Sequence, residues 1–168
     1  MEEENRAAVT DSNETAGRLM EAADRHLELY EMDEAMDLLN KALAILLPKR
    51  EFEEQAAWAY AALGDCYFIQ GDLREALRSY IKAFNLPNGY ANAYVLLRAG
   101  QVYHEMGNEA QARYYLLQAY LIEGDSLFEG EDPKYFQLIG GDELLREDAF
   151  ADIGQLEPSD REERSGQV

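Results

Sequence analysis

Residues 57–90 read AWAYAALGDCYFIQGDLREALRSYIKAFNLPNGY, and residues 93–124 keep the same spacing as AYVLLRAGQVYHEMGNEAQARYYLLQAYLIEG. Residues three or four apart lie on one face of a helix, and small residues there let two backbones approach. A glycine followed by Asp or Asn is typical of one helix ending and the next beginning. Each stretch therefore predicts a hairpin of two helices. The matching positions are Gly64, Tyr67, Gly71-Asp72 and Ala76 in the first stretch, and Gly100, Tyr103, Gly107-Asn108 and Ala112 in the second.

A third, earlier copy precedes these two. It keeps the second-helix spacing Ala35-x3-Leu39-x2-Ala42 but has no glycine at its turn. The three copies together resemble the tetratricopeptide repeat family, whose unit of about 34 residues is a helical hairpin. The resemblance implies an all-α fold in which hairpins at about 16–49, 51–90 and 91–122 form a short right-handed α-solenoid. An ordinary helical bundle is the alternative.

The ends of the chain are more acidic than the middle. The 168 residues include 34 Asp or Glu and 15 Lys or Arg, for a net charge of −19. We expect residues 1–15 to be an acidic N-terminal extension to the repeat array of residues 16–122. Residues 123–141, which include an Asp-Pro helix start, are expected to form a capping segment with a C-terminal helix. Residues 142–168 are expected to be an acidic, partly disordered tail.

Composition argues against several classes of function. A protein this acidic repels phosphate backbones and anionic membrane surfaces, so neither nucleic acid nor membrane is an expected partner. No apolar run approaches the roughly 20 residues that span a bilayer; residues 42–47, for example, number only six. The start MEEENRAAV does not resemble an export signal, and a single cysteine suits a reducing compartment. We expect a cytoplasmic protein.

Few residues suggest catalysis or metal binding. His26 and His104 have no second ligand at helical spacing, and Cys66 lies inside a predicted helix, where a packed thiol is the simpler interpretation. No glycine-rich phosphate loop is present. The sequence therefore predicts a protein that is not an enzyme and has neither cofactor nor metal.

The family resemblance implies a binding groove lined by the first helix of each hairpin. Large aromatic side chains on that side are typical binding anchors. The alternative is that the ends of the chain cover Trp58 and Phe68. The predicted groove residues are Met20, Asp24, Leu27, Trp58, Ala61, Asp65, Phe68, Tyr94, Leu97, Gln101 and His104.

The groove residues favour a basic partner. Family members that clamp a chaperone's terminal carboxylate have Lys and Asn where this chain has Met20 and Asp24, and an acid there would repel an anion. Residues 120–139 look like the closing segment of small bacterial repeat proteins of the toxin-immunity type. That resemblance implies an immunity protein that neutralises a basic, nuclease-like toxin domain. The alternative is a secretion chaperone or adaptor that holds an extended apolar peptide in its groove.

Overall fold

The structure is a computed structural model that describes residues 2–86 and 92–140, with side chains from residue 11 onward. All the regular secondary structure in these residues is helical. The expected tail, residues 142–168, lies outside them. The elements are α1 (Glu2–Glu28), α2 (Met32–Leu46), η1 (Arg50–Phe52), α3 (Glu53–Gln70), α4 (Leu73–Asn85), α5 (Ala93–Glu105), α6 (Glu109–Glu123), η3 (Asp125–Phe128) and α7 (Pro133–Leu138).

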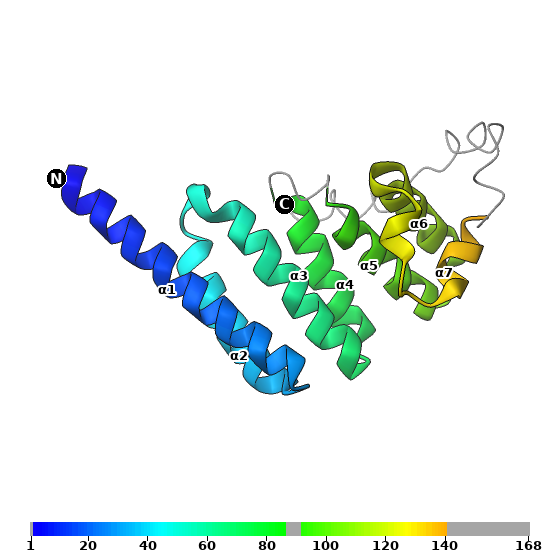
Figure 1. Ribbon diagram of the computed structural model, residues 1–168, viewed down its shortest axis with the longest axis horizontal. Helices are drawn as coiled ribbons and strands as arrows, with labels where there is room; N and C mark the ends of the chain where they lie inside the picture. The colour runs from blue at the N-terminus through cyan, green and yellow to red at the C-terminus, as the bar shows by residue number, and fades with distance from the viewer. Residues whose placement is uncertain (1, 87–91, 141–168) are drawn as a thin grey trace, which may run out of the picture.

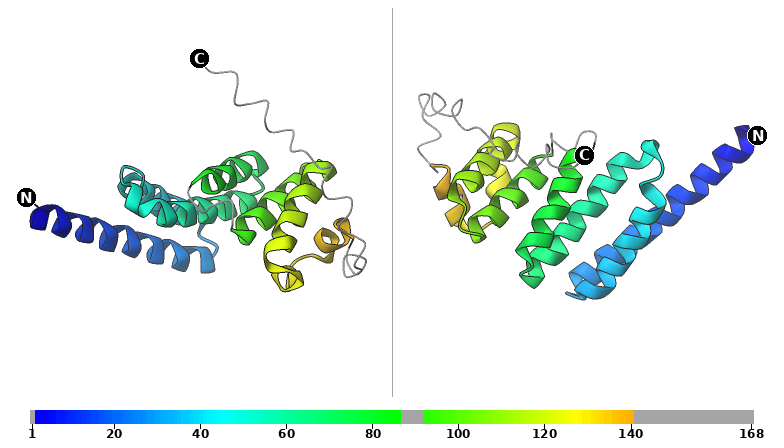
Figure 2. Two further views of the ribbon diagram at one scale, coloured as in Figure 1. Left: turned by 90° about the horizontal axis from the view of Figure 1, so that it is seen from above. Right: turned by 180° about the vertical axis from the view of Figure 1, so that it is seen from behind.

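The helices pair into three hairpins that stack in chain order. Hairpin 1 is α1 with α2, hairpin 2 is α3 with α4, and hairpin 3 is α5 with α6. Neighbouring hairpins meet where α2 packs on α3 and where α4 packs on α5, as Figures 1 and 2 show from three sides. The predicted fold class, an all-α array of three hairpins followed by a capping helix, is confirmed.

The turns inside the hairpins follow the predicted chemistry where the glycine is present. Gly71 and Gly107 have φ of 80° and 78°, a left-handed conformation that costs glycine nothing. The next residue then caps the second helix, because the side chain of Asp72 accepts from the Glu75 amide and Asn108 does the same for α6. The hairpin 1 turn has neither the glycine nor the capping side chain.

At that turn a tyrosine occupies the glycine position. Tyr30 has φ of 59°, and Glu31 after it makes no side-chain cap to α2. The backbone hydrogen bonds are still those of the other turns, with the Glu31 amide donating to the His26 carbonyl at 2.9 Å. The weaker first copy thus forms the same turn, with a side chain in a conformation that favours glycine.

Small residues let the two helices of a hairpin touch. A Cβ on Gly64 would lie 2.6 Å from the Tyr80 ring, and one on Gly100 would lie 2.7 Å from the Leu116 side chain. Ala76 on the facing helix of hairpin 2 is fully buried. The predicted role of these positions in helix contact is confirmed.

The ends of the repeat array show how far its helices extend. Helix α1 runs without a break through residue 15, where an extension was expected to end, and its first turns project beyond α2 (Figure 1). Helix α3 has 18 residues against 13 in α5, so the first helix of hairpin 2 is longer than that of hairpin 3. At the other end, Phe128, Tyr135 and Ile139 of the segment after α6 join the core of hairpin 3.

Candidate functional site

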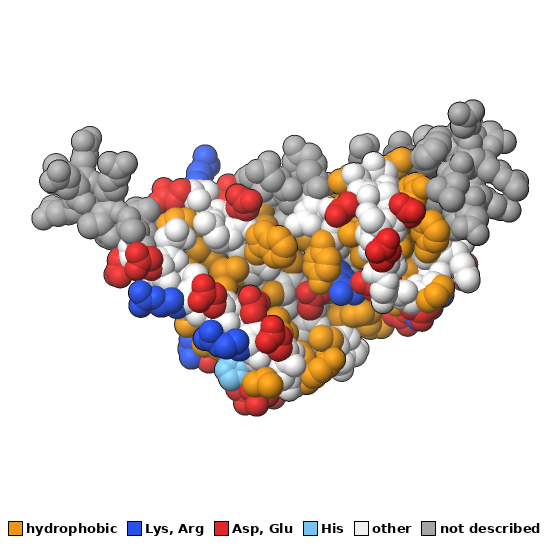
Figure 3. All heavy atoms as spheres, viewed as in Figure 1, with side chains coloured by type: hydrophobic (Ala, Val, Ile, Leu, Met, Phe, Trp, Pro, Cys, Tyr) orange, Lys and Arg blue, Asp and Glu red, His pale blue; other side chains and the backbone are white. Residues whose placement is uncertain are grey.

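The face formed by the first helices of the hairpins is hollowed between hairpins 1 and 2. The cavity has a volume of about 340 Å³. In Figure 3, hydrophobic side chains gather in the middle of this face and acidic side chains lie beside them. The lining residues are Met20, Asp24 and Leu27 of α1, Leu39 of α2, Trp58, Ala61, Ala62 and Asp65 of α3, and Tyr94 of α5.

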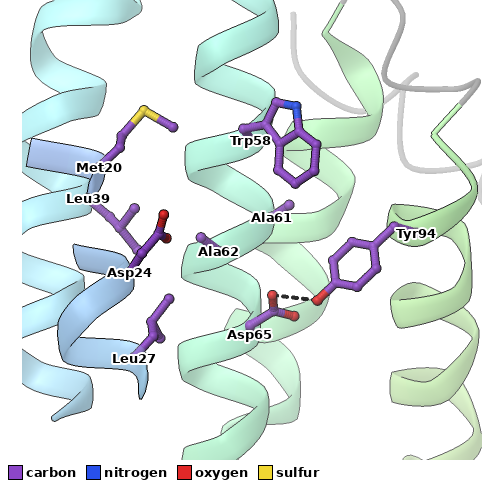
Figure 4. A pocket seen from close by; sticks show the side chains of 9 residues that line it. All are labelled: Met20, Asp24, Leu27, Leu39, Trp58, Ala61, Ala62, Asp65 and Tyr94. Carbon is purple, nitrogen blue, oxygen red and sulfur yellow. Dashed lines mark hydrogen bonds between the residues drawn. The ribbon is translucent and has the colours of Figure 1, made fainter. Parts of the chain in front are cut away.

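Helical spacing explains why these side chains converge. Met20, Asp24 and Leu27 follow each other at four and three residues along α1, so they share one face. Trp58, Ala61 and Asp65 do the same along α3. Stacking α1 beside α3 then turns both stripes toward one cavity, as Figure 4 shows. The structure thus brings Tyr94 together with the predicted groove residues of hairpins 1 and 2. Phe68 is the exception.

Trp58 and Asp24 are the accessible groups of the cavity. Trp58 is 55% exposed, although it is the largest side chain at the site. Asp24 is exposed, and it forms no hydrogen bond or ion pair with any residue that the structure describes. The cavity thus presents an apolar surface from α3 and, from α1, a carboxylate without a partner among the described residues.

The Asp65 carboxylate, in contrast, already has hydrogen-bond partners within the protein. The Tyr80 hydroxyl donates to its Oδ1 at 2.6 Å, and the Tyr94 hydroxyl donates to its Oδ2 at 2.7 Å. Arg98 Nε lies 3.5 Å from the same carboxylate and donates to the Tyr94 oxygen at 3.0 Å. Burial raises the pKa of the Asp65 carboxyl, while the two hydroxyls and Arg98 act in the opposite direction.

Arg98 connects this cluster to the segment after α6. Its Nη1 donates to Gln101 Oε1 at 2.8 Å, and Gln101 Nε2 donates to Glu131 Oε2 at 2.7 Å. Arg98 also lies 3.4 Å from Glu131. Asp65, Arg98 and Glu131 therefore form a polar bridge between hairpin 2, hairpin 3 and the capping segment.

The capping segment covers the groove positions of hairpin 3 other than Tyr94. Leu97 and Gln101 are fully buried, and Leu97 packs in one core cluster with Tyr135 of α7. The His104 ring meets Tyr135 edge to face at a centroid distance of 5.6 Å. The structure therefore does not bring Leu97, Gln101 or His104 to the open cavity, because residues 125–139 occupy the space in front of them.

Phe68 also lies outside the cavity. It is half-buried against the core between hairpins 2 and 3. Sequence reasoning missed three further residues, Leu39 and Ala62 in the cavity wall and Arg98 beside it. The sequence spacing could have indicated Arg98, because it lies four residues after Tyr94 and three before Gln101 and so shares their face of the helix.

The structure gives little support for chemistry at the remaining candidates. Cys66 is buried, and its burial raises the pKa of the thiol to about 11, so the reactive thiolate is scarce at neutral pH. His26 Nδ1 lies 2.6 Å from Glu31 Oε2 at the hairpin 1 turn, away from the cavity. Among the described residues, no group of three or more His, Cys, Asp or Glu could hold a metal ion. No described helix is long and apolar enough to cross a membrane.

Comparison with known proteins identifies the repeats. The family model described as tetratricopeptide repeat matches residues 59–89 and 93–126, which are hairpins 2 and 3. Among solved structures, the chain is similar to "Crystal structure of MamA", with a TM-score of 0.58, 18% sequence identity, and 83% of this chain and 85% of that chain covered. An identity this low shows the fold alone. No curated protein matches the chain. Residues 59–89 and 93–126 therefore match tetratricopeptide repeats, which suggest a protein–protein interaction module.

Proposed function

We propose that the protein is a non-enzymatic cytoplasmic module that binds a basic protein partner, and that it acts as an immunity protein against a nuclease-like toxin domain. The observation that carries the proposal is the open cavity between hairpins 1 and 2, where Trp58 is exposed and Asp24 has no partner among the described residues. The rest of the groove is covered by the chain itself, so a groove ligand enters here. The net charge of −19 favours a partner of opposite sign.

The charges and the anchor have different effects on binding. Long-range attraction raises the association rate of a basic domain at low salt. Burial of the Trp58 indole slows dissociation, because aromatic anchors account for much of the binding energy at protein interfaces. A neutraliser needs both properties, since it must capture a toxin quickly and hold it.

The test is binding to the basic domain encoded beside this gene. Isothermal titration calorimetry is expected to give a tight one-to-one complex, and the complex is expected to have no nuclease activity. Trp58→Ala is expected to weaken binding by about 2 kcal/mol, roughly thirtyfold. Ile122→Ala is the matched control, because Ile122 is 50% exposed at the end of α6 and does not line the cavity. A protein that ignores the neighbouring domain, or leaves it active, would contradict the immunity role.

A second candidate is a secretion chaperone or adaptor. The apolar part of the cavity wall, Met20, Leu27 and Trp58, supports it, because an extended apolar segment would bury against these side chains. This function predicts binding of an apolar peptide with little dependence on salt. Titrating the complex at rising salt separates the two candidates, since binding of a basic toxin weakens and binding of an apolar segment does not.

A further inference from the structure

We infer that the cavity between hairpins 1 and 2 is a receptor for one cationic side chain of the partner, arginine or lysine, held between the Trp58 indole and the Asp24 carboxylate. This inference rests on the function proposed above and names the chemical group that the site takes. Three independent features of the cavity support it.

The first feature is the combination of apolar walls with an acidic rim. Met20, Leu27 and Leu39 line the hairpin 1 side of the cavity. The Asp24 carboxylate lies on that side too, and the Asp65 carboxylate lies on the α3 side (Figure 4). Arginine and lysine have the matching form, since their long aliphatic stems pack on apolar surface while the charged head reaches a polar group. An anionic side chain would meet both carboxylates and be repelled.

The second feature is the different state of the two carboxylates. Asp65 already accepts hydrogen bonds from Tyr80 and Tyr94, and its charge is shared with Arg98. Asp24 lies across the cavity from it and has no partner among the described residues (Figure 4). A ligand cation is therefore expected to pair with Asp24, with Asp65 adding attraction at longer range.

The third feature is that Trp58 pairs with no cation from the described part of the chain. The described chain places a lysine or arginine over several aromatic rings, and each of those rings belongs to a phenylalanine or a tyrosine. Tryptophan is the best aromatic partner for a cation, yet among the described residues no lysine or arginine lies over the Trp58 ring. Its exposed face is thus available to a cation from outside. The existing pairs are Lys49 with Phe52, Lys82 with Tyr60, Arg98 with Tyr94, and Lys134 with Tyr135.

The single tryptophan makes the test direct. Trp58 is the only tryptophan in the chain, so its emission and its indole N–H signal in NMR spectra both report on this cavity. The probes are capped arginine and capped lysine, with capped citrulline as the neutral analogue of arginine. We expect saturable shifts of the indole signal with the two cations, and binding of citrulline about fivefold weaker than that of arginine.

Asp24→Asn tests the carboxylate. Because Asp24 is exposed, the variant is expected to fold, and circular dichroism checks this. It should bind arginine as weakly as the wild type binds citrulline. Asp11→Asn is the matched control, since it makes the same change on the same helix about 20 Å away and should leave arginine binding unchanged.

The outcomes separate this inference from the proposed function. Equal binding of citrulline and arginine, or full arginine binding by Asp24→Asn, would overturn the cation receptor. If the toxin-like domain still binds Asp24→Asn with wild-type affinity, the cation receptor is overturned while the immunity role stands. If the neighbouring domain does not bind but arginine does, and in an Asp24-dependent way, the immunity role is overturned while the cation receptor stands.

Discussion

Replacing Gly100 with alanine tests whether close helix contact holds hairpin 3 together. An added Cβ would lie 2.7 Å from Leu116 Cγ, 2.9 Å from Cδ2 and 3.1 Å from the Leu116 backbone nitrogen. Leu116 is fully buried, so its side chain cannot simply rotate away into solvent. Helices α5 and α6 must therefore move apart, and the core beneath the capping segment must loosen with them.

Two opposing effects set the size of the change. Alanine in place of glycine inside a helix stabilises it by about 1 kcal/mol. Forcing an extra methyl group into a packed core costs typically about 1–3 kcal/mol. Because the contact here includes a backbone atom as well as a side chain, we expect the upper half of that range. Gly100→Ala should then lower the free energy of unfolding by about 1–2 kcal/mol, which corresponds to a fall in Tm of roughly 2–8 °C.

Gly17→Ala provides the matched control. Gly17 also lies within a helix, α1, but no atom lies within 4 Å of where its Cβ would be. Only the gain in helix propensity remains there, so this variant should be up to about 1 kcal/mol more stable than the wild type. Urea unfolding followed by far-UV circular dichroism measures both. If the two variants change stability in the same direction and by the same amount, helix propensity alone accounts for them and the close contact at Gly100 has no energetic role.

Two further predictions concern the first turn and the capping segment. Tyr30→Gly should raise the free energy of unfolding by up to about 1 kcal/mol. The left-handed conformation costs a residue with a side chain about 1–2 kcal/mol, and removing the exposed Tyr30 ring loses little packing. Thermal unfolding measures this change, and a lower Tm would contradict the prediction. Glu105 accepts hydrogen bonds from Lys134 and Tyr135, which lower its pKa below the ordinary 4.5. Its stabilising effect is therefore present at neutral pH and is lost as pH falls through the lowered pKa. In urea unfolding, the wild type should have a larger free energy of unfolding than Glu105→Gln at pH 7, but not in acid. A difference that is the same at every pH would refute this.

The hairpins could be predicted because their signals are local. A glycine or alanine facing a large residue, and a glycine before a capping residue, depend on neighbours a few positions away. The start of α1 was less accessible to this reasoning. Residues 1–15 were set apart by their acidity, but glutamate and alanine are good helix formers and no proline occurs before Pro48. Charge marked a change in composition and not a change in secondary structure.

The site was predicted as far as the repeats determine it. The stripes of α1 and α3 follow from helical period and stacking, so Asp24 and Trp58 could be placed together from the sequence. The burial of Gln101 could not be predicted in this way, because it depends on Glu131. That residue lies 30 positions away, in the capping segment, which does not follow the repeat pattern. A capping segment could be predicted from the need to cover the last apolar face, but not which groove positions it would occupy.

The covered half of the groove also shapes the open half. Tyr94 forms one wall of the cavity, and its hydroxyl is fixed by Asp65 on one side and Arg98 on the other. Arg98 is in turn held by Glu131 of the capping segment. A paired network of this kind keeps its members in one arrangement, because breaking any pair leaves a half-buried charge uncompensated. The polar residues Arg98 and Gln101 of hairpin 3 would therefore affect binding indirectly, by holding the wall against which a ligand of Trp58 and Asp24 would rest.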